Sequence, residues 1–150
     1  MEFSRRDLAW LLPAIAAAQT QVQTQAQTQA QTAAPQVLPS RAVAFEDLPV
    51  RKNGANSSRA MLNGLTHSNF AIEVHQSELA PGEQPHAPHK HVHEELVLLW
   101  QGSLEYTVNG VTSKLDAGSY AYAASNDLHG MRNAGDKPAR YFVIAFGKDN

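Results

Sequence analysis

The dipeptide Asn109-Gly110 stands between two runs of β-forming residues, LEYTV and VTSKL. Both central residues of a type I′ turn have positive φ angles, which Asn and Gly tolerate better than other residues, so this pattern predicts a tight hairpin. Short runs of the same kind, separated by turn residues, occur on both sides of it: AVAF, RAMLNGLT, FAIEVHQSEL, ELVLLWQG, SYAYAAS and ARYFVIAFG. Together they predict an all-β sandwich or barrel over residues 41–150.

Two of these runs, ELVLLW and YFVIAF, are apolar at both alternating positions. Successive side chains of a strand point to opposite faces, so this pattern predicts strands that are covered on both sides. The chain has 150 residues, of which 43% are apolar, which is sufficient for one domain with one packed core.

The charge and the cysteine content exclude several functions. A formal net charge of -2 lacks the basic excess that binding to a phosphate backbone requires, so we expect no nucleic-acid partner. The chain has no cysteine, which excludes disulfides, thiolate ligands and a cysteine nucleophile. Any metal chemistry therefore depends on nitrogen and oxygen side chains, and on the seven histidines above all.

The N-terminal stretch MEFSRRDLAWLLPAIAAAQ is typical of an export signal. It combines Arg5 and Arg6 with an apolar run over residues 8–18 that is too short to cross a bilayer, for which about 20 residues are needed. SRRDL resembles part of the twin-arginine signal. We therefore expect a signal at residues 1–18, a periplasmic or extracellular location in a bacterium, and no stable membrane anchor after processing. An amphipathic N-terminal helix is the alternative.

Residues 19–40 contain the near-repeat QTQVQTQAQTQAQTAAPQ, which has neither aromatic nor charged residues. Such a segment cannot bury enough apolar surface to offset the entropy lost on ordering, so we expect a disordered linker. Low-complexity drift without a function is the alternative interpretation.

Four histidines at positions 86, 89, 91 and 93 run directly into two glutamates. Because residues i and i+2 of a strand share a face, His89, His91 and Glu95 can point to one place. His93 points to the same face if the strand is regular and away from it if the segment bends. Periodicity alone does not decide between these two geometries. A flexible surface tract that binds metal adventitiously is the alternative for this stretch by itself.

Within PGEQPHAPHKHVHEELVLLWQG, His89 and His91 are followed after three residues by Glu95 and after six more by Gly102. This spacing resembles the first motif of the cupins, except that the preceding Gly82 lies one residue too early. GSYAYAASNDLHGMRN resembles the second cupin motif, with Ala124 and Asn126 in the places of a proline and a glycine. The residues of that segment that match are Gly118, His129 and Asn133. Asn tolerates the left-handed conformation, so we expect Asn126 to preserve the turn.

The resemblance implies a double-stranded β-helix, or jelly-roll, barrel in which His89, His91, Glu95 and His129 bind one divalent transition metal. Three imidazoles and a carboxylate suit Mn, Fe, Ni, Cu or Zn and leave positions open for other ligands. We consider pocket or supporting roles for His86, His93, Gln101, Tyr106 and Met131, and also for Tyr120, Tyr122 and Arg140. We interpret His67 and His75 as ordinary surface or barrel-wall residues.

The chain has neither a nucleophile elbow nor a phosphate-binding glycine loop. The expected function is that of a metal-dependent enzyme acting on a small oxygen-bearing molecule, with dioxygenases as the leading subclass and no residue assigned as general acid or base. A non-catalytic periplasmic protein that binds a metal or small ligand is the main alternative, and a structural dimer unit is a weaker one. The resemblance also implies a homodimer, with residues 43–65 near its interface.

Overall fold

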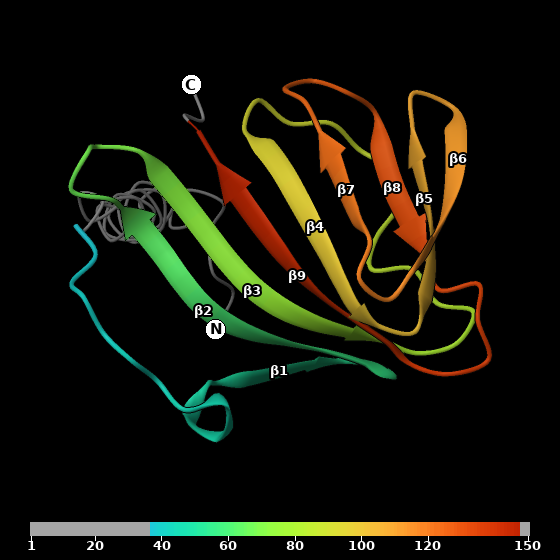
Figure 1. Cartoon of the computed structure of the whole chain (residues 1–150), viewed down its shortest axis with the longest axis horizontal. Helices are drawn as coiled ribbons and strands as arrows, with labels where there is room; N and C mark the ends of the chain where they lie inside the picture. Colours follow the sequence, from blue (N-terminus) through green and yellow to red (C-terminus); the bar gives the residue numbers. More distant parts are fainter. Residues whose placement is uncertain (1–36, 148–150) are drawn as a thin grey trace, which may run out of the picture. The chain divides into compact units, whose positions relative to one another are not determined.

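The computed structural model describes residues 37–147. The expected export signal at residues 1–18 lies outside this range, as do residues 19–36 of the expected linker. Strands dominate this part of the chain (Figure 1), so the all-β prediction is confirmed. Its one short 3-10 helix is Phe45–Asp47, and no helix within residues 37–147 has the length and hydropathy needed to cross a membrane.

The strands form two antiparallel sheets. The larger sheet has the order β1-β2-β3-β9-β4-β7 and the smaller one the order β6-β5-β8. The strands of the larger sheet are β1 (Val50–Asn53), β2 (Asn56–Leu65), β3 (Ala71–Leu79), β4 (Glu94–Gln101), β7 (Tyr120–Ala123) and β9 (Ala139–Phe146). Those of the smaller sheet are β5 (Ser103–Val108), β6 (Val111–Asp116) and β8 (His129–Arg132).

The predicted hairpin joins β5 to β6. Val108 pairs with Val111, and Asn109 and Gly110 between them have φ angles of 48° and 83°. Asn109 has a second role, because its side-chain oxygen accepts a hydrogen bond from the backbone N–H of Leu128 at 3.0 Å. The hairpin therefore holds the segment that leads into β8, where the last predicted metal ligand lies.

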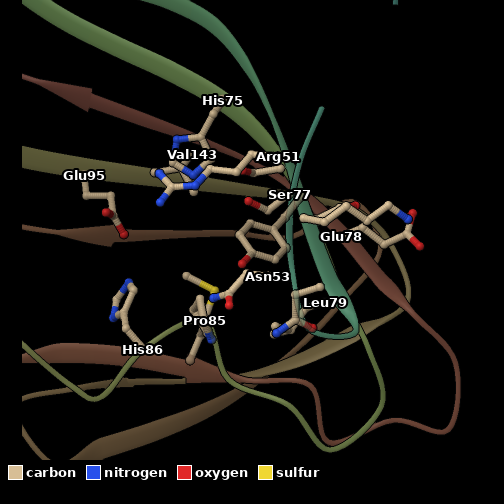
Figure 2. Close-up of a pocket in the computed structure, with 16 residues that line it drawn as sticks. Arg51, Asn53, His75, Ser77, Glu78, Leu79, Pro85, His86, Glu95 and Val143 are labelled. Atoms are coloured by element: carbon tan, nitrogen blue, oxygen red, sulfur yellow. The ribbon is translucent and has the colours of Figure 1, made fainter. Parts of the chain in front are cut away.

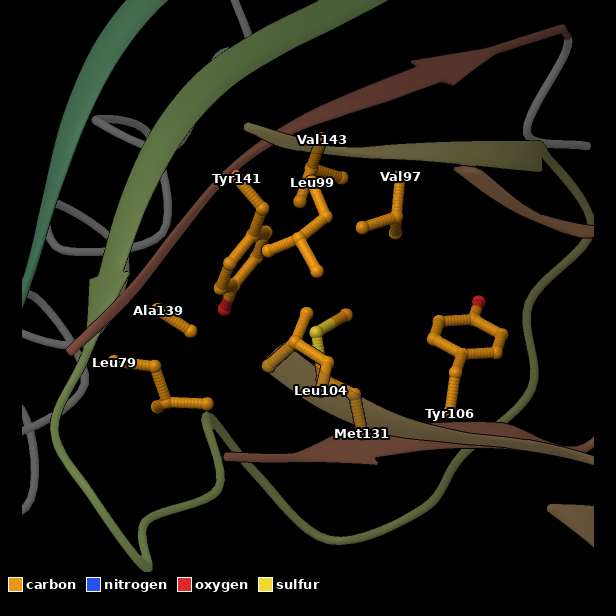
Figure 3. Packing of buried hydrophobic residues seen from close by; sticks show 9 residues of the cluster. All are labelled: Leu79, Val97, Leu99, Leu104, Tyr106, Met131, Ala139, Tyr141 and Val143. Carbon is orange, nitrogen blue, oxygen red and sulfur yellow. The ribbon is translucent and has the colours of Figure 1, made fainter. Parts of the chain in front are cut away.

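The core lies between the inner faces of the two sheets (Figure 3). Its buried apolar side chains form one cluster, to which the larger sheet contributes Leu79, Val97, Leu99, Ala139, Tyr141 and Val143, and the smaller sheet Leu104, Tyr106 and Met131. Every second side chain of a strand points inward, and the inward side chains of the two sheets pack closely against one another.

The expectation that ELVLLW is covered on both faces is wrong for its outer positions. Val97 and Leu99 are buried inside, but Leu98 and Trp100 point to the other face and are 38% and 46% exposed. The indole of Trp100 stacks on the ring of Phe142 of the neighbouring strand β9, with ring centroids 6.3 Å apart. Packing between side chains of neighbouring strands therefore covers part of the apolar surface on this face of the larger sheet.

Candidate metal centre

Three histidines converge at one end of the space between the sheets. His89 lies in the segment before β4 and pairs with His129, the first residue of β8, through two backbone hydrogen bonds of 2.9 Å. The side chains of His89, His91 and His129 each offer one nitrogen, and these nitrogens lie within 4.8 Å of one another. The backbone bridge thus joins two segments that are 40 residues apart in the sequence.

The parity of His93, which periodicity left open, is decided by a bend at residues 92 and 93, directly before β4 begins. His93 does not belong to the group of converging nitrogens, and its ring stacks on that of His91 with centroids 3.6 Å apart. Its carbonyl oxygen accepts a hydrogen bond from Nδ1–H of His91 at 2.8 Å. His93 therefore positions the ring of His91.

The hydrogen bonds of two histidines determine which nitrogen faces the site. Nδ1–H of His91 donates to the carbonyl of His93, and Nδ1–H of His129 donates to the carbonyl of Asp127 at 2.9 Å. In a neutral imidazole the other nitrogen then carries the lone pair. In both rings this atom, Nε2, is buried and has no hydrogen-bond partner in the described structure.

His89 presents a third buried nitrogen, because its Nδ1 also has no hydrogen-bond partner in residues 37–147. Burial, assisted by the neighbouring imidazoles of His86 and His129, lowers the pKa of His89 to about 4. The ring is therefore neutral near pH 7, which is the form that binds metals.

Glu95 completes the set from the inner face of β4. Its carboxylate oxygens lie 3.7 Å from Nε2 of His91 and 3.7 Å from Nε2 of His129, and the side chain is 12% exposed. Unpartnered buried nitrogens are costly in a folded protein, and a carboxylate beside them supplies negative charge. Three buried imidazole nitrogens without hydrogen-bond partners and a carboxylate are a donor set that fits a divalent transition metal.

A cavity of about 470 Å³ adjoins this group (Figure 2). Glu95, His86 and Met131 belong to its wall, which is completed by residues of β1, β2, β3 and β9. Glu95 is therefore shared between the histidine group and a space large enough for a small molecule.

Besides His93, three of the residues for which we considered pocket or supporting roles lie close to the centre. The exposed His86 packs its ring edge-on against His89, with centroids 4.3 Å apart. Met131 is buried and lines the cavity. The ring of Tyr106 lies parallel to that of His129 at 6.3 Å, and its buried hydroxyl has no partner in the described range. Burial and the nearby Glu95 carboxylate raise the pKa of this phenol, so it stays protonated.

The other candidates lie away from the centre. Gln101 is exposed and accepts a hydrogen bond of 3.3 Å from Nη1 of Arg140, because a shift in strand register after Leu99 interrupts the inward alternation of β4. Tyr120 and Tyr122 are 68% and 45% exposed on β7. None of these four side chains is brought to the histidine group.

The second motif fixes the geometry around His129. Asn126 has a φ angle of 64°, so the expected left-handed turn is confirmed. Asn133 is fully buried and donates hydrogen bonds to the carbonyl oxygens of Leu79 and Lys137, at 2.8 and 2.9 Å. Its own side-chain oxygen accepts from the N–H of Gly135 at 3.0 Å. Asn133 thus holds together the loop after β8.

Sequence reasoning gave no role in the site to three further cavity residues, Arg51, His75 and Ser77. His75 was interpreted as a surface or barrel-wall residue, and the structure places it in the cavity wall with Nδ1 hydrogen-bonded to Glu73. The spacing of Glu73 and His75, two residues apart in FAIEVHQSEL, was the available signal, because such residues share a face of a strand.

The fold and the site define a small antiparallel β-barrel protein with a group of histidines that could hold a metal ion. Residues 75–145 match the family model Cupin_2, described as a cupin domain. The chain is 28% identical over 101 residues to Protein SchB of Streptomyces halstedii, covering 67% of this chain and 73% of that protein.

The solved structures that are similar to the described fold include the following two. The polyketide cyclase RemF from Streptomyces resistomycificus has a TM-score of 0.61 and 18% identity, with 74% of this chain and 82% of that chain covered. A predicted oxalate decarboxylase from Thermotoga maritima has a TM-score of 0.60 and 16% identity, with 72% and 100% covered. These likenesses establish the fold. The predicted jelly-roll barrel fold is thereby confirmed, and the match over residues 75–145 agrees with the resemblance of the two motifs to those of the cupins.

Proposed function

We propose that this cupin domain is a metal-dependent enzyme that acts on a small oxygen-bearing molecule in the cavity beside Glu95. The observation that carries the proposal is the presence of three buried histidine nitrogens without partners, together with a carboxylate that also lines a cavity of about 470 Å³. Enzyme sites commonly combine such a cavity with a few convergent polar groups.

A divalent metal held by His89, His91, Glu95 and His129 would supply Lewis-acid polarisation of a substrate oxygen. The chain itself performs the positioning. The carbonyls of His93 and Asp127 hold two imidazoles with Nε2 toward the centre, and the carboxylate of Glu95 offsets positive charge there. Partners of this kind usually affect metal affinity about 10- to 100-fold.

The names of the similar proteins support chemistry on oxygen-rich small molecules, since one is a polyketide cyclase and another a predicted oxalate decarboxylase. The dioxygenase subclass stays a prediction, because open coordination positions permit it without requiring it. Oxygen consumption by the iron and manganese forms across a panel of phenols and diketones tests it. Ligand binding without turnover remains the alternative function, and absence of any product from such a panel would favour it.

The experiment that tests the metal site is elemental analysis of purified protein and its alanine variants. Wild type is expected to hold about one metal ion per chain, and His91→Ala and His129→Ala should each lose most of it. The metal affinity of these two variants should fall by more than the roughly 10- to 100-fold that is usual when a hydrogen-bond partner of a ligand is removed. His67→Ala is the matched control, because His67 lies in the exposed turn between β2 and β3. Unchanged metal content in both ligand variants would overturn the proposed centre.

A further inference from the structure

Glu73 and His75 form a hydrogen-bonded pair on the inner face of β3. Nδ1–H of His75 donates to the carboxylate of Glu73, whose two oxygens lie 2.9 and 3.0 Å away. A carboxylate can only accept, so the proton of the neutral ring is held on Nδ1 and the lone pair lies on Nε2. This is the arrangement by which a carboxylate orients an imidazole that acts as a base.

His75 belongs to the wall of the same cavity as Glu95, and Figure 2 shows its side chain extending from β3 toward that space. The only hydrogen bonds of its ring among residues 37–147 are those to Glu73. The His75 side chain is 29% exposed. Its Nε2 is therefore available to a molecule bound in the cavity.

We propose that His75, oriented by Glu73, accepts the proton from a substrate carbon next to a carbonyl group, which makes the substrate a carbon acid of the β-dicarbonyl class. This inference rests on the proposed function. The C–H bond breaks, its electron pair moves into the adjacent carbonyl to give an enolate, and its proton goes to Nε2. Return of that proton from the imidazolium to carbon or oxygen restores the base, so no external oxidant or reductant is needed.

The charges around His75 suit this step. Arg51 reaches the cavity from β1 and can stabilise the negative oxygen of an enolate, and it has no ion pair in the described part of the chain (Figure 2). Tyr141 faces the cavity from β9, and burial raises the pKa of its phenol to about 12, so it does not compete as a base. Glu73 contacts His75 without lining the cavity. The titratable or charged residues that line the cavity with His75 are Arg51, Lys52, Glu78, His86, Glu95 and Tyr141.

The test uses the metal-loaded full chain and methyl acetoacetate as a β-dicarbonyl probe. Exchange of its C2 hydrogens in D₂O is followed by proton NMR at low buffer concentration. We expect exchange above the buffer rate for wild type, a loss of about 100-fold or more in His75→Gln, and no change in His67→Gln, because a positioned general base contributes about 10²- to 10⁴-fold. Metal content and thermal unfolding are measured for every variant.

A second variant tests the orienting role by a readout that a merely structural role would not move. Long-range ¹H–¹⁵N spectra of wild type should show the His75 proton on Nδ1. In Glu73→Gln the amide can donate as well as accept, so part of the population should carry its proton on Nε2 and the exchange rate should fall.

The outcomes separate this inference from the proposed function. Exchange by His75→Gln at the wild-type rate overturns the role of His75 and leaves the metal centre intact. Equal exchange by metal-free and metal-loaded wild type contradicts the metal-dependent function but supports His75. No acceleration by wild type overturns the base and the substrate class together, while elemental analysis judges the metal centre independently. If His75→Gln does not fold, an unchanged rate and tautomer in Glu73→Gln overturn the proposal.

Discussion

The backbone N–H of Asn126 donates a hydrogen bond of 2.8 Å to the carbonyl oxygen of His91. This contact joins the two histidine-containing motifs directly, and Asn126 makes it from a left-handed conformation with a φ angle of 64°. The position therefore needs a residue that tolerates positive φ, which Asn and Gly do at lower cost than other residues.

Asn126→Gly should leave the free energy of unfolding nearly unchanged, whereas Asn126→Val should reduce it by about 1–2 kcal/mol, because a β-branched residue is strained at positive φ. Since the turn holds the carbonyl of His91, the Val variant should also bind metal more weakly. Urea unfolding and a metal titration measure the two effects. Equal stability of the Gly and Val variants would show that this conformation does not matter.

Gly102 separates β4 from β5 and should be far less replaceable than another glycine with the same backbone angle. A Cβ at Gly102 would lie 2.8 Å from Cα of Ala139 and 2.8 Å from the carbonyl oxygen of Pro138, while a Cβ at Gly110 would meet nothing within 4 Å. Both residues have a φ angle of 83°. The difference between them therefore isolates the steric contact from the backbone strain.

Gly110→Ala should cost about 1–2 kcal/mol from the positive φ angle alone. Gly102→Ala should cost about 1–3 kcal/mol more, since backbone atoms rather than flexible side-chain ends must move. Chemical denaturation of both variants beside wild type measures the difference. Similar losses in the two variants would mean that β9 moves away from residue 102 at little cost.

Much of this centre was accessible from the sequence because its residues are tied to local patterns. The Asn-Gly turn and the positive φ angle of Asn126 follow from backbone rules that act over a few residues, whereas His91 and Glu95 converge across a bend at residues 92 and 93 and not along one regular strand. The proximity of His89 and His129 in space does not follow from such local rules. It is established by the pairing of β8 with β5 and with the segment before β4. Here the resemblance to cupin motifs supplied what local rules could not.

The cavity could not be read from the sequence for the same reason. Its wall is made by β1, β2, β3 and β9, and the roles of Arg51 and His75 depend on which strands lie next to one another. The exposure of Trp100 was mispredicted because an apolar run does not say whether a further layer covers it. Export of the protein and its assembly as a homodimer stay predictions.

The buried hydroxyl of Tyr106 gives a test in which removing a polar atom should not weaken the fold. Tyr106 is 3% exposed and its hydroxyl has no partner within the structure described. A buried unsatisfied polar group costs about 1–3 kcal/mol. Tyr106→Phe should therefore leave the thermal stability of the metal-free protein unchanged or raise it. A marked loss of stability would mean that the hydroxyl is hydrogen-bonded in solution, for which a buried water is the simplest partner.

The lowered pKa of His89 predicts how the metal-free protein responds to acid. Folding lowers the pKa of this imidazole from 6.5 to about 4, chiefly through burial, so between these values the unfolded chain binds more protons than the folded one. The contribution of His89 to stability is therefore fully present above about pH 6.5 and is lost progressively as the pH falls to about 4.

Urea unfolding of chelator-treated protein, measured between pH 7 and pH 4, tests this contribution. The decline in the free energy of unfolding should be shallower in His89→Gln than in wild type, because the neutral amide cannot take up a proton in either state. The difference between the two curves removes the effects of the other histidines, to the extent that these do not depend on His89. Parallel curves would show that His89 titrates alike in the folded and the unfolded chain, and that the ring is less buried than the structure places it.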